Sequence, residues 1–194
     1  MNRFLTLAIF FPILLASCSP SSDNASSSSS ELVASLRARK YSIDSLINKE
    51  RKLIALAKVK GRESLVDMPK AAGQRIEAVF NVYKNDGRII YIAEMPKSPE
   101  DEWFIAYKSY FDEQGKLFAF QRQNNFFHSD CTDGAALESL VKYYNQEFES
   151  VDSTYSLTDS RKKELETADC KFPYNFPYKI YKDVEEYQQQ VKGL

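Results

Sequence analysis

The chain has 194 residues, which is room for one ordinary domain together with targeting material. A hydrophobic content of 43% is enough to build a core, and a formal net charge of −1 argues against a protein that binds DNA or RNA. Tyr and Phe occur 12 and 13 times against one Trp and one His, which suits an antiparallel sheet with large rings packed on its faces.

The N-terminus has the pattern of an export signal. Asn2 and Arg3 give a short positive start, and residues 4–15 are apolar apart from one threonine and one proline. This run is shorter than the roughly 20 residues that a helix needs to span a bilayer. We therefore expect a signal peptide that is cleaved.

The motif Leu15-Ala16-Ser17-Cys18 ends this signal and resembles the lipobox of bacterial lipoproteins. The resemblance implies that the Cys18 thiol carries a diacylglyceryl group and that the lipoprotein signal peptidase removes residues 1–17. The alternative is an ordinary secretory signal followed by a chance cysteine. Two or three acyl chains would hold the protein stably in a membrane, because each buried CH₂ contributes about 0.8 kcal/mol.

The residues after Cys18 indicate in which membrane the protein is held and how the domain is connected to its lipid. Ser19 stands where many inner-membrane lipoproteins of enterobacteria have Asp, so the resemblance implies an outer-membrane protein that faces the periplasm. Residues 19–30 are mostly serine, and such a segment cannot bury enough surface to fold. We expect residues 18–30 to be the lipidated cysteine with a flexible tether, and residues 31–194 to be a single globular domain.

Helical periodicity follows the serine-rich segment. Ser28 and Glu31 have the spacing of a capping box, and Gly61 suits the position after a helix end. Between them, apolar residues recur at spacings typical of an amphipathic helix. These residues are Leu32, Leu36, Ile43, Leu46, Ile47, Leu53, Ile54 and Ala57. We expect one long helix, which Ser42 would divide if it caps a second segment.

Strand patterns begin at residue 76, where apolar and polar side chains alternate. Turn sequences that end in Gly87 and Gly115 predict two hairpins, because glycine accepts the positive φ of such turns. The four expected strands cover residues 76–83, 88–95, 103–111 and 116–127. The two hairpins have similar turn sequences, which indicates either a true repeat or two independent hairpins that use the same turn chemistry.

The C-terminal third shows helical spacing again. Asp133 would cap a helix with Leu137, Leu140, Val141, Tyr144 and Phe148 on its buried side, and further helices are expected at 159–167 and 181–191. The predicted fold is therefore α+β. A long N-terminal helix packs on a four-stranded antiparallel β-meander, followed by C-terminal helices and one disulfide.

The disulfide is inferred from the cysteine count. Three cysteines are unusual in an exported protein, where thiols tend to pair. If lipid occupies Cys18, then Cys131 and Cys170 remain as a pair. We expect them to form a disulfide that closes a loop of about 40 residues.

Catalytic signals are weak. His128, Ser129 and Asp130 are neighbours in sequence, whereas catalytic triads assemble from separate parts of a fold. Glu100, Asp101 and Glu102 offer carboxylates in a polar loop where solvated charge is the simpler explanation. Asp130 with Asp133 lacks the further ligands of a calcium loop, and one histidine excludes a His-rich zinc site. We expect no enzyme activity, no metal and no cofactor.

The best binding candidate is the aromatic strap, residues 172–178, which alternates aromatic side chains with proline. Tyr174, Phe176 and Tyr178 are candidates to contact a partner, and covering the core is the alternative. We expect a non-enzymatic lipoprotein of the bacterial envelope, held at the membrane by its lipid, that binds a protein or glycan partner. The alternatives are an envelope hydrolase that uses carboxylates or Ser129 and His128, and an inhibitor of a host enzyme such as lysozyme.

Overall fold

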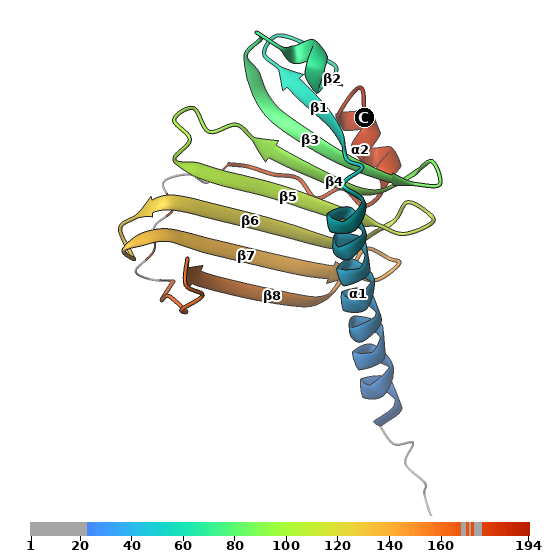
Figure 1. The fold of residues 1–194 in the computed structure, drawn as a ribbon. Coiled ribbons are helices and arrows are strands. Elements are labelled where there is room, and N and C mark those ends of the chain that lie inside the picture. The colour runs from blue at the N-terminus through green and yellow to red at the C-terminus, as the bar shows by residue number, and fades with distance from the viewer. Residues whose placement is uncertain (1–22, 168–169, 171, 173–175) are drawn as a thin grey trace, which may run out of the picture.

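The computed structural model describes residues 23–167, 170, 172 and 176–194, with side chains from residue 29 onward (Figure 1). Its frame is an eight-stranded antiparallel sheet in the order β2-β1-β3-β4-β5-β6-β7-β8. The strands are β1 (Ile54–Val59), β2 (Val66–Asp67), β3 (Ile76–Asn85), β4 (Arg88–Pro96), β5 (Trp103–Phe111), β6 (Leu117–Ser129), β7 (Gly134–Tyr144) and β8 (Ser150–Asp159). A short 3₁₀ helix, η1 (Met68–Ala71), follows β2.

The two faces of the sheet are covered by different segments. The long helix α1 (Asp23–Glu50) crosses one face, which we call the helix face (Figure 1). On the opposite face, which we call the strap face, the C-terminal segment packs on the main core with the short helix α2 (Val184–Gln190). This core includes Phe80, Ile92, Ile105, Tyr107, Phe111, Phe120 and Tyr187. No helix in the described part of the chain is long and apolar enough to cross a membrane.

Both expected hairpins are present, but the four-stranded sheet is wrong. β3 pairs with β4 and β5 pairs with β6, and their turns place Gly87 and Gly115 at φ values of 78° and 76°. Four further strands, β1, β2, β7 and β8, extend the sheet on both sides.

The first of these additional strands replaces the end of the expected long helix. The helix ends at Glu50, and Arg51 has a φ of 54°, outside the helical region. Residues 54–59 form β1, in which Leu56 and Ala57 are buried in different clusters on opposite faces. At its other end α1 begins at Asp23, so its first turns fall within the serine-rich segment for which we expected a tether.

Two expected C-terminal helices are also wrong. Residues 134–144 of the first form the strand β7, and in the second, residues 159–167, the strand β8 ends at Asp159 and no helix follows among these residues. β7 has covered side chains on both faces, so Leu137 and Val141 face one side while Leu140 faces the other. Two alternating apolar sets produce the same spacing as one helical stripe. The closing helix is present as α2, where the Asp183 side chain accepts a hydrogen bond of 2.8 Å from the Glu186 backbone N–H.

The expected disulfide is confirmed. Cys131 lies in the turn between β6 and β7, and Cys170 follows β8, with 4.9 Å between their Cα atoms. The bond ties the chain just before the aromatic strap to one end of the sheet. It therefore fixes where the C-terminal segment begins its path over the strap face.

Replacing both cysteines with serine (Cys131→Ser with Cys170→Ser) should lower the free energy of unfolding by about 4 kcal/mol, because the disulfide restricts the unfolded chain over a separation of 39 residues. Urea denaturation followed by circular dichroism measures this loss. The wild-type protein in reducing agent should unfold at the same urea concentration as the double variant. Equal unfolding midpoints for the oxidised wild type and the variant would contradict a stabilising role.

Candidate binding surface

Helix α1 covers only one end of the helix face. Leu36 and Ile43 pack against Tyr91, Tyr110 and Phe118, close to the hairpin turns. The other end of the same face, towards the loop at residues 97–102, has no described element in front of it (Figure 1). The helix therefore divides the helix face into a covered half and a bare half.

A buried polar contact sets the position of α1. The Tyr110 side chain is fully buried, and its hydroxyl donates a hydrogen bond of 2.8 Å to Asp44 Oδ1. Lys40 Nζ donates to Asp44 Oδ2 at 2.8 Å and lies 4.7 Å from the centre of the Tyr110 ring. Burial and the nearby Asp44 carboxylate raise the pKa of Tyr110 far above its usual range, so the hydroxyl stays a donor.

Two further contacts hold α1 on either side of Asp44. The Tyr83 hydroxyl donates to Glu50 Oε2 at 2.7 Å, and Arg37 pairs with Asp152 on β8 at 2.8 Å. The Tyr83 hydrogen bond is the main cause that lowers the pKa of Glu50. With the central contact to Tyr110, these links join the helix to β3, β5 and β8, so it crosses most of the sheet in one defined position.

The bare half presents a polar surface that we call the amide face. Its side chains form three rows across four strands and share one side of the sheet. The rows are Lys108, Gln121, Val141 and Thr154; Ala106, Gln123, Ser139 and Ser156; and Phe104, Asn125, Leu137 and Thr158. Hydroxyl and amide groups dominate, and Lys108 is the one charged side chain among them.

Hydrogen bonds order the middle of the amide face. Lys108 Nζ donates to Gln123 Oε1 at 2.8 Å, and the Gln123 amide nitrogen donates to Asn125 Oδ1 at 3.4 Å. The Gln121 amide nitrogen donates to Ser139 Oγ at 3.0 Å. The Asn125 amide nitrogen donates to no group in the described part of the chain, so it is available to a ligand. Burial lowers the pKa of Lys108.

An apolar pocket of about 320 Å³ adjoins the amide face and shares Phe104 with it. Its apolar lining comes from Val79, Met95, Pro96, Trp103, Phe104 and Phe127. The ion pair between Lys97 and Asp101, with 2.8 Å between Nζ and Oδ1, lies at the same pocket. The volume is at the small end of the range of about 300–1,000 Å³ that is typical of ligand pockets.

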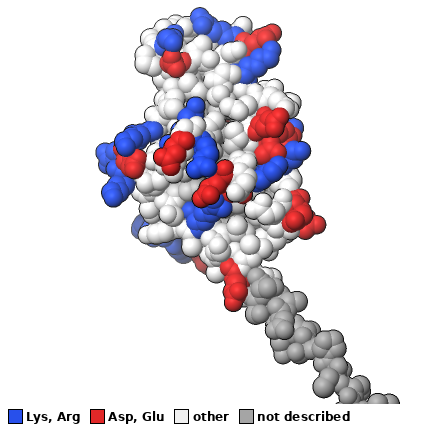
Figure 2. Space-filling model, turned by 90° about the vertical axis from the view of Figure 1, so that its right-hand side faces the viewer, with Lys and Arg blue, Asp and Glu red and all other residues white. Residues whose placement is uncertain are grey.

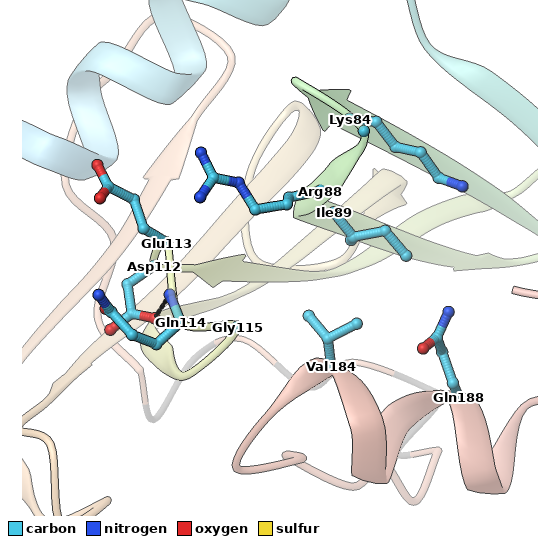
Figure 3. Close-up of a pocket in the computed structure, with 10 residues that line it drawn as sticks. Lys84, Arg88, Ile89, Asp112, Glu113, Gln114, Gly115, Val184 and Gln188 are labelled. Carbon is cyan, nitrogen blue, oxygen red and sulfur yellow. Dashed lines mark hydrogen bonds between the residues drawn. The ribbon is translucent and has the colours of Figure 1, made fainter.

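A second pocket, of about 340 Å³, lies between the two hairpin turns and α2 (Figure 3). Lys84 and Arg88 come from the first hairpin, and Val184 and Gln188 from α2. Asp112 is buried, and its Oδ1 accepts from the backbone N–H groups of residues 114 and 116 at 2.9 and 2.8 Å. The Asp112 carboxylate is therefore occupied in holding the turn together. We interpret the pocket as a gap left where the two hairpins pack beside α2.

The described part of the aromatic strap packs against the strap face. The Tyr178 ring stacks on Tyr107 and Phe120, with centroid distances of 4.9 and 5.5 Å. Phe176 packs against Trp103 at 5.2 Å and keeps 42% of its surface exposed. Tyr174, the third candidate of the strap, lies outside the described residues. Tyr178 therefore serves as cover for the sheet, and Phe176 is the described candidate of the strap that keeps an exposed surface.

A buried polar network underlies the strap, and the sequence did not reveal it. Glu138 accepts hydrogen bonds from Arg122 at 3.0 Å, Asn124 at 2.6 Å and Tyr155 at 3.2 Å. Arg122 also lies over the ring of Tyr178, 5.7 Å from its centre. The sequence pattern predicts a helix at Glu138, and a helix would not place this side chain beside those of β6.

The remaining residues considered from sequence do not converge. His128 and Asp130 are exposed, and the Ser129 hydroxyl lies 2.8 Å from Cys131 Sγ. Glu100, Asp101 and Glu102 are exposed, and Cys18 lies outside the described residues. Within the described ranges, no group of three or more His, Cys, Asp or Glu side chains could hold a metal ion. No protein-family model matches the chain, and neither a curated protein nor a solved structure matches it.

The variant Tyr110→Phe should loosen α1, because it removes the buried hydroxyl that donates to Asp44. We expect the free energy of unfolding to fall by about 1–2 kcal/mol and the amide protons of α1 to exchange faster. Hydrogen–deuterium exchange with mass spectrometry measures both effects.

The matched control is Tyr155→Phe, which removes a hydroxyl that donates to Glu138 at 3.2 Å from a side chain that is 46% exposed. This change should cost less stability and leave exchange in α1 unaltered. If α1 exchanged at the same rate in both variants, the position of the helix would not depend on Tyr110.

Proposed function

We propose that the protein is a lipoprotein of the bacterial cell envelope that acts as a non-enzymatic binding module for a protein or glycan partner. Lipid on Cys18 would hold it at the outer membrane, facing the periplasm, after removal of residues 1–17. The amide face and the adjoining apolar pocket would form the binding surface.

The bare half of the helix face is the observation that carries the binding role. A helix over the middle of the sheet would bury more of the helix face than one at its end. Instead, α1 is fixed across one end by the contact between Tyr110 and Asp44. The uncovered part is ordered by hydrogen bonds through Gln123 rather than filled with apolar groups. Ordered polar groups beside an apolar pocket are typical of binding sites.

The geometry favours binding over the hydrolase alternative. The Ser129 hydroxyl, the expected nucleophile, contacts Cys131 Sγ and also accepts a hydrogen bond from the Cys131 backbone N–H at 3.2 Å. Both contacts serve the turn that carries the disulfide. The polar groups next to the apolar pocket come from the amide face instead.

The variant Cys18→Ala should lose fatty-acid labelling and move from the membrane fraction to the soluble fraction, because the thiol that accepts the lipid is gone. Metabolic labelling with a palmitate analogue, followed by fractionation, measures both properties. Ser19→Ala is the control, since it keeps the thiol and should behave as the wild type. A Cys18→Ala protein that kept its label and its membrane association would refute the anchor.

A photoreactive amino acid at Gln123 should give covalent adducts in intact cells, because the amide face meets the partner there. The same probe at Gln189, an exposed glutamine on α2, should give none. Protease-sensitive adducts would indicate a protein partner, and glycosidase-sensitive adducts a glycan. Equal yields at the two positions would contradict the amide face as the binding surface.

A further inference from the structure

The amide face differs in charge from the rest of the molecule. Charged residues make up 27% of the chain, yet the three rows of this face contain Lys108 as their single charged residue and no carboxylate. The end of the sheet with the hairpin turns instead carries many charged side chains of both signs (Figure 2). Even Lys108 is engaged, because its ammonium group donates to Gln123 at 2.8 Å.

The polar groups of this face suit a ligand that both donates and accepts hydrogen bonds. Amide side chains such as Gln123 and Asn125 present a donor and an acceptor side by side, and Ser139 and Ser156 add hydroxyls. Small side chains, Ala106 and the two serines, accompany Gln123 in the middle row. A flat ligand can therefore approach the Gln123 amide without meeting large neighbours in its own row.

The apolar pocket adds a place for a weakly polar ring. Phe104 belongs to both surfaces, and Phe127, which is 40% exposed, lines the pocket beside it. The C–H faces of sugar rings pack on aromatic side chains, whose ring faces carry partial negative charge. A ring in this pocket would lie next to Asn125, the partner of Phe104 across β5 and β6, whose amide nitrogen donates to no group among the described residues.

We propose that the amide face binds an uncharged oligosaccharide, an inference that rests on the proposed binding function and specifies its ligand. One sugar ring occupies the apolar pocket against Phe104. The following rings lie across the rows of the amide face and exchange hydrogen bonds with Asn125 and Gln123.

Other classes of partner fit this surface less well. Nucleic acids and anionic lipids require several free cations, whereas Lys108 on the amide face is hydrogen-bonded to Gln123 and Lys97 at the pocket is paired with Asp101. Protein interfaces are enriched in Tyr, Trp, Met and Arg at their centres, and the middle row holds Ala106, Gln123, Ser139 and Ser156. Hydroxyl-rich ligands match the neutral amides and hydroxyls that are present.

The ring of Trp103, the single tryptophan of the chain, packs on Phe176 on the strap face, so calorimetry is the direct measure of binding at the pocket. We would titrate the full chain, purified in neutral detergent without a sugar headgroup, with cellotetraose and with N-acetylated chitotetraose. A saturable heat of binding with either probe in isothermal titration calorimetry supports the proposal. The expected dissociation constants lie in roughly the micromolar to millimolar range. A sulfated tetrasaccharide should bind more weakly than the uncharged probes, and tighter binding of it would overturn the proposal.

Replacing an amide side chain of the amide face with alanine should weaken ligand binding, whereas the same replacement on α2 should not. Gln123→Ala and Asn125→Ala should each raise the dissociation constant by about tenfold, because each removes hydrogen bonds to the ligand. Gln189→Ala on α2 is the matched control and should bind as the wild type. Circular dichroism of each variant verifies the fold. Unchanged affinity in folded Gln123→Ala and Asn125→Ala, or no saturable signal with either uncharged probe, would overturn the oligosaccharide inference.

Failure of this inference is separable from failure of the proposed function. If neither uncharged probe binds but the photoreactive residue at position 123 captures a protein in cells, the oligosaccharide inference is wrong and the binding function stands. If neither probe binds and position 123 captures nothing beyond the Gln189 control, both are wrong.

Discussion

The hydrogen bond between the Tyr110 hydroxyl and Asp44 is the contact on which the arrangement of the helix face depends. The buried Tyr110 hydroxyl is best satisfied by Asp44 Oδ1 at 2.8 Å, because its other acceptor, Gln121 Oε1, is 3.5 Å away, and this favours one position of the helix over β5. That preference fixes both the depth and the position of α1 on the sheet. Because the contact lies near one end of the strands, the helix cannot also cover the other end, and the amide face remains open.

The strap face is covered by a different kind of segment from the helix face. Its cover is the C-terminal segment, in which the described residues 176–182 form neither helix nor strand, and which is held by the disulfide at one end and by the stacking of Tyr178. Tyr178 lies against two rings and the Arg122 guanidinium, and that guanidinium is balanced by Glu138. The stability of this face comes from aromatic packing and a paired buried charge, whereas the helix face combines packing with exposed polar groups.

The sequence predicted the parts of the fold that depend on residues close together in the chain or on the cysteine count. The turns at Gly87 and Gly115 and the alternation around them gave the central hairpins, and the cysteine count gave the disulfide. β7 was mistaken for a helix because its apolar residues serve two faces, which only the assembled sheet reveals, and β8 was not predicted. The amide face was missed for the same reason. Gln121, Gln123 and Asn125 alternate along β6, a visible signal, but their neighbours on one side belong to β7, a strand that the sequence did not predict.

The starting point of α1 determines how the proposed lipid anchor would orient the sheet. From Asp23 to Leu36, its first buried residue among the described side chains, the helix rises about 20 Å at 1.5 Å per residue. Its N-terminal end projects beyond β8, so β8 is the edge of the sheet closest to the start of α1 (Figure 1). The helix would then act as a stiff spacer, and the sheet would stand upright on the bilayer with the amide face pointing sideways along its surface.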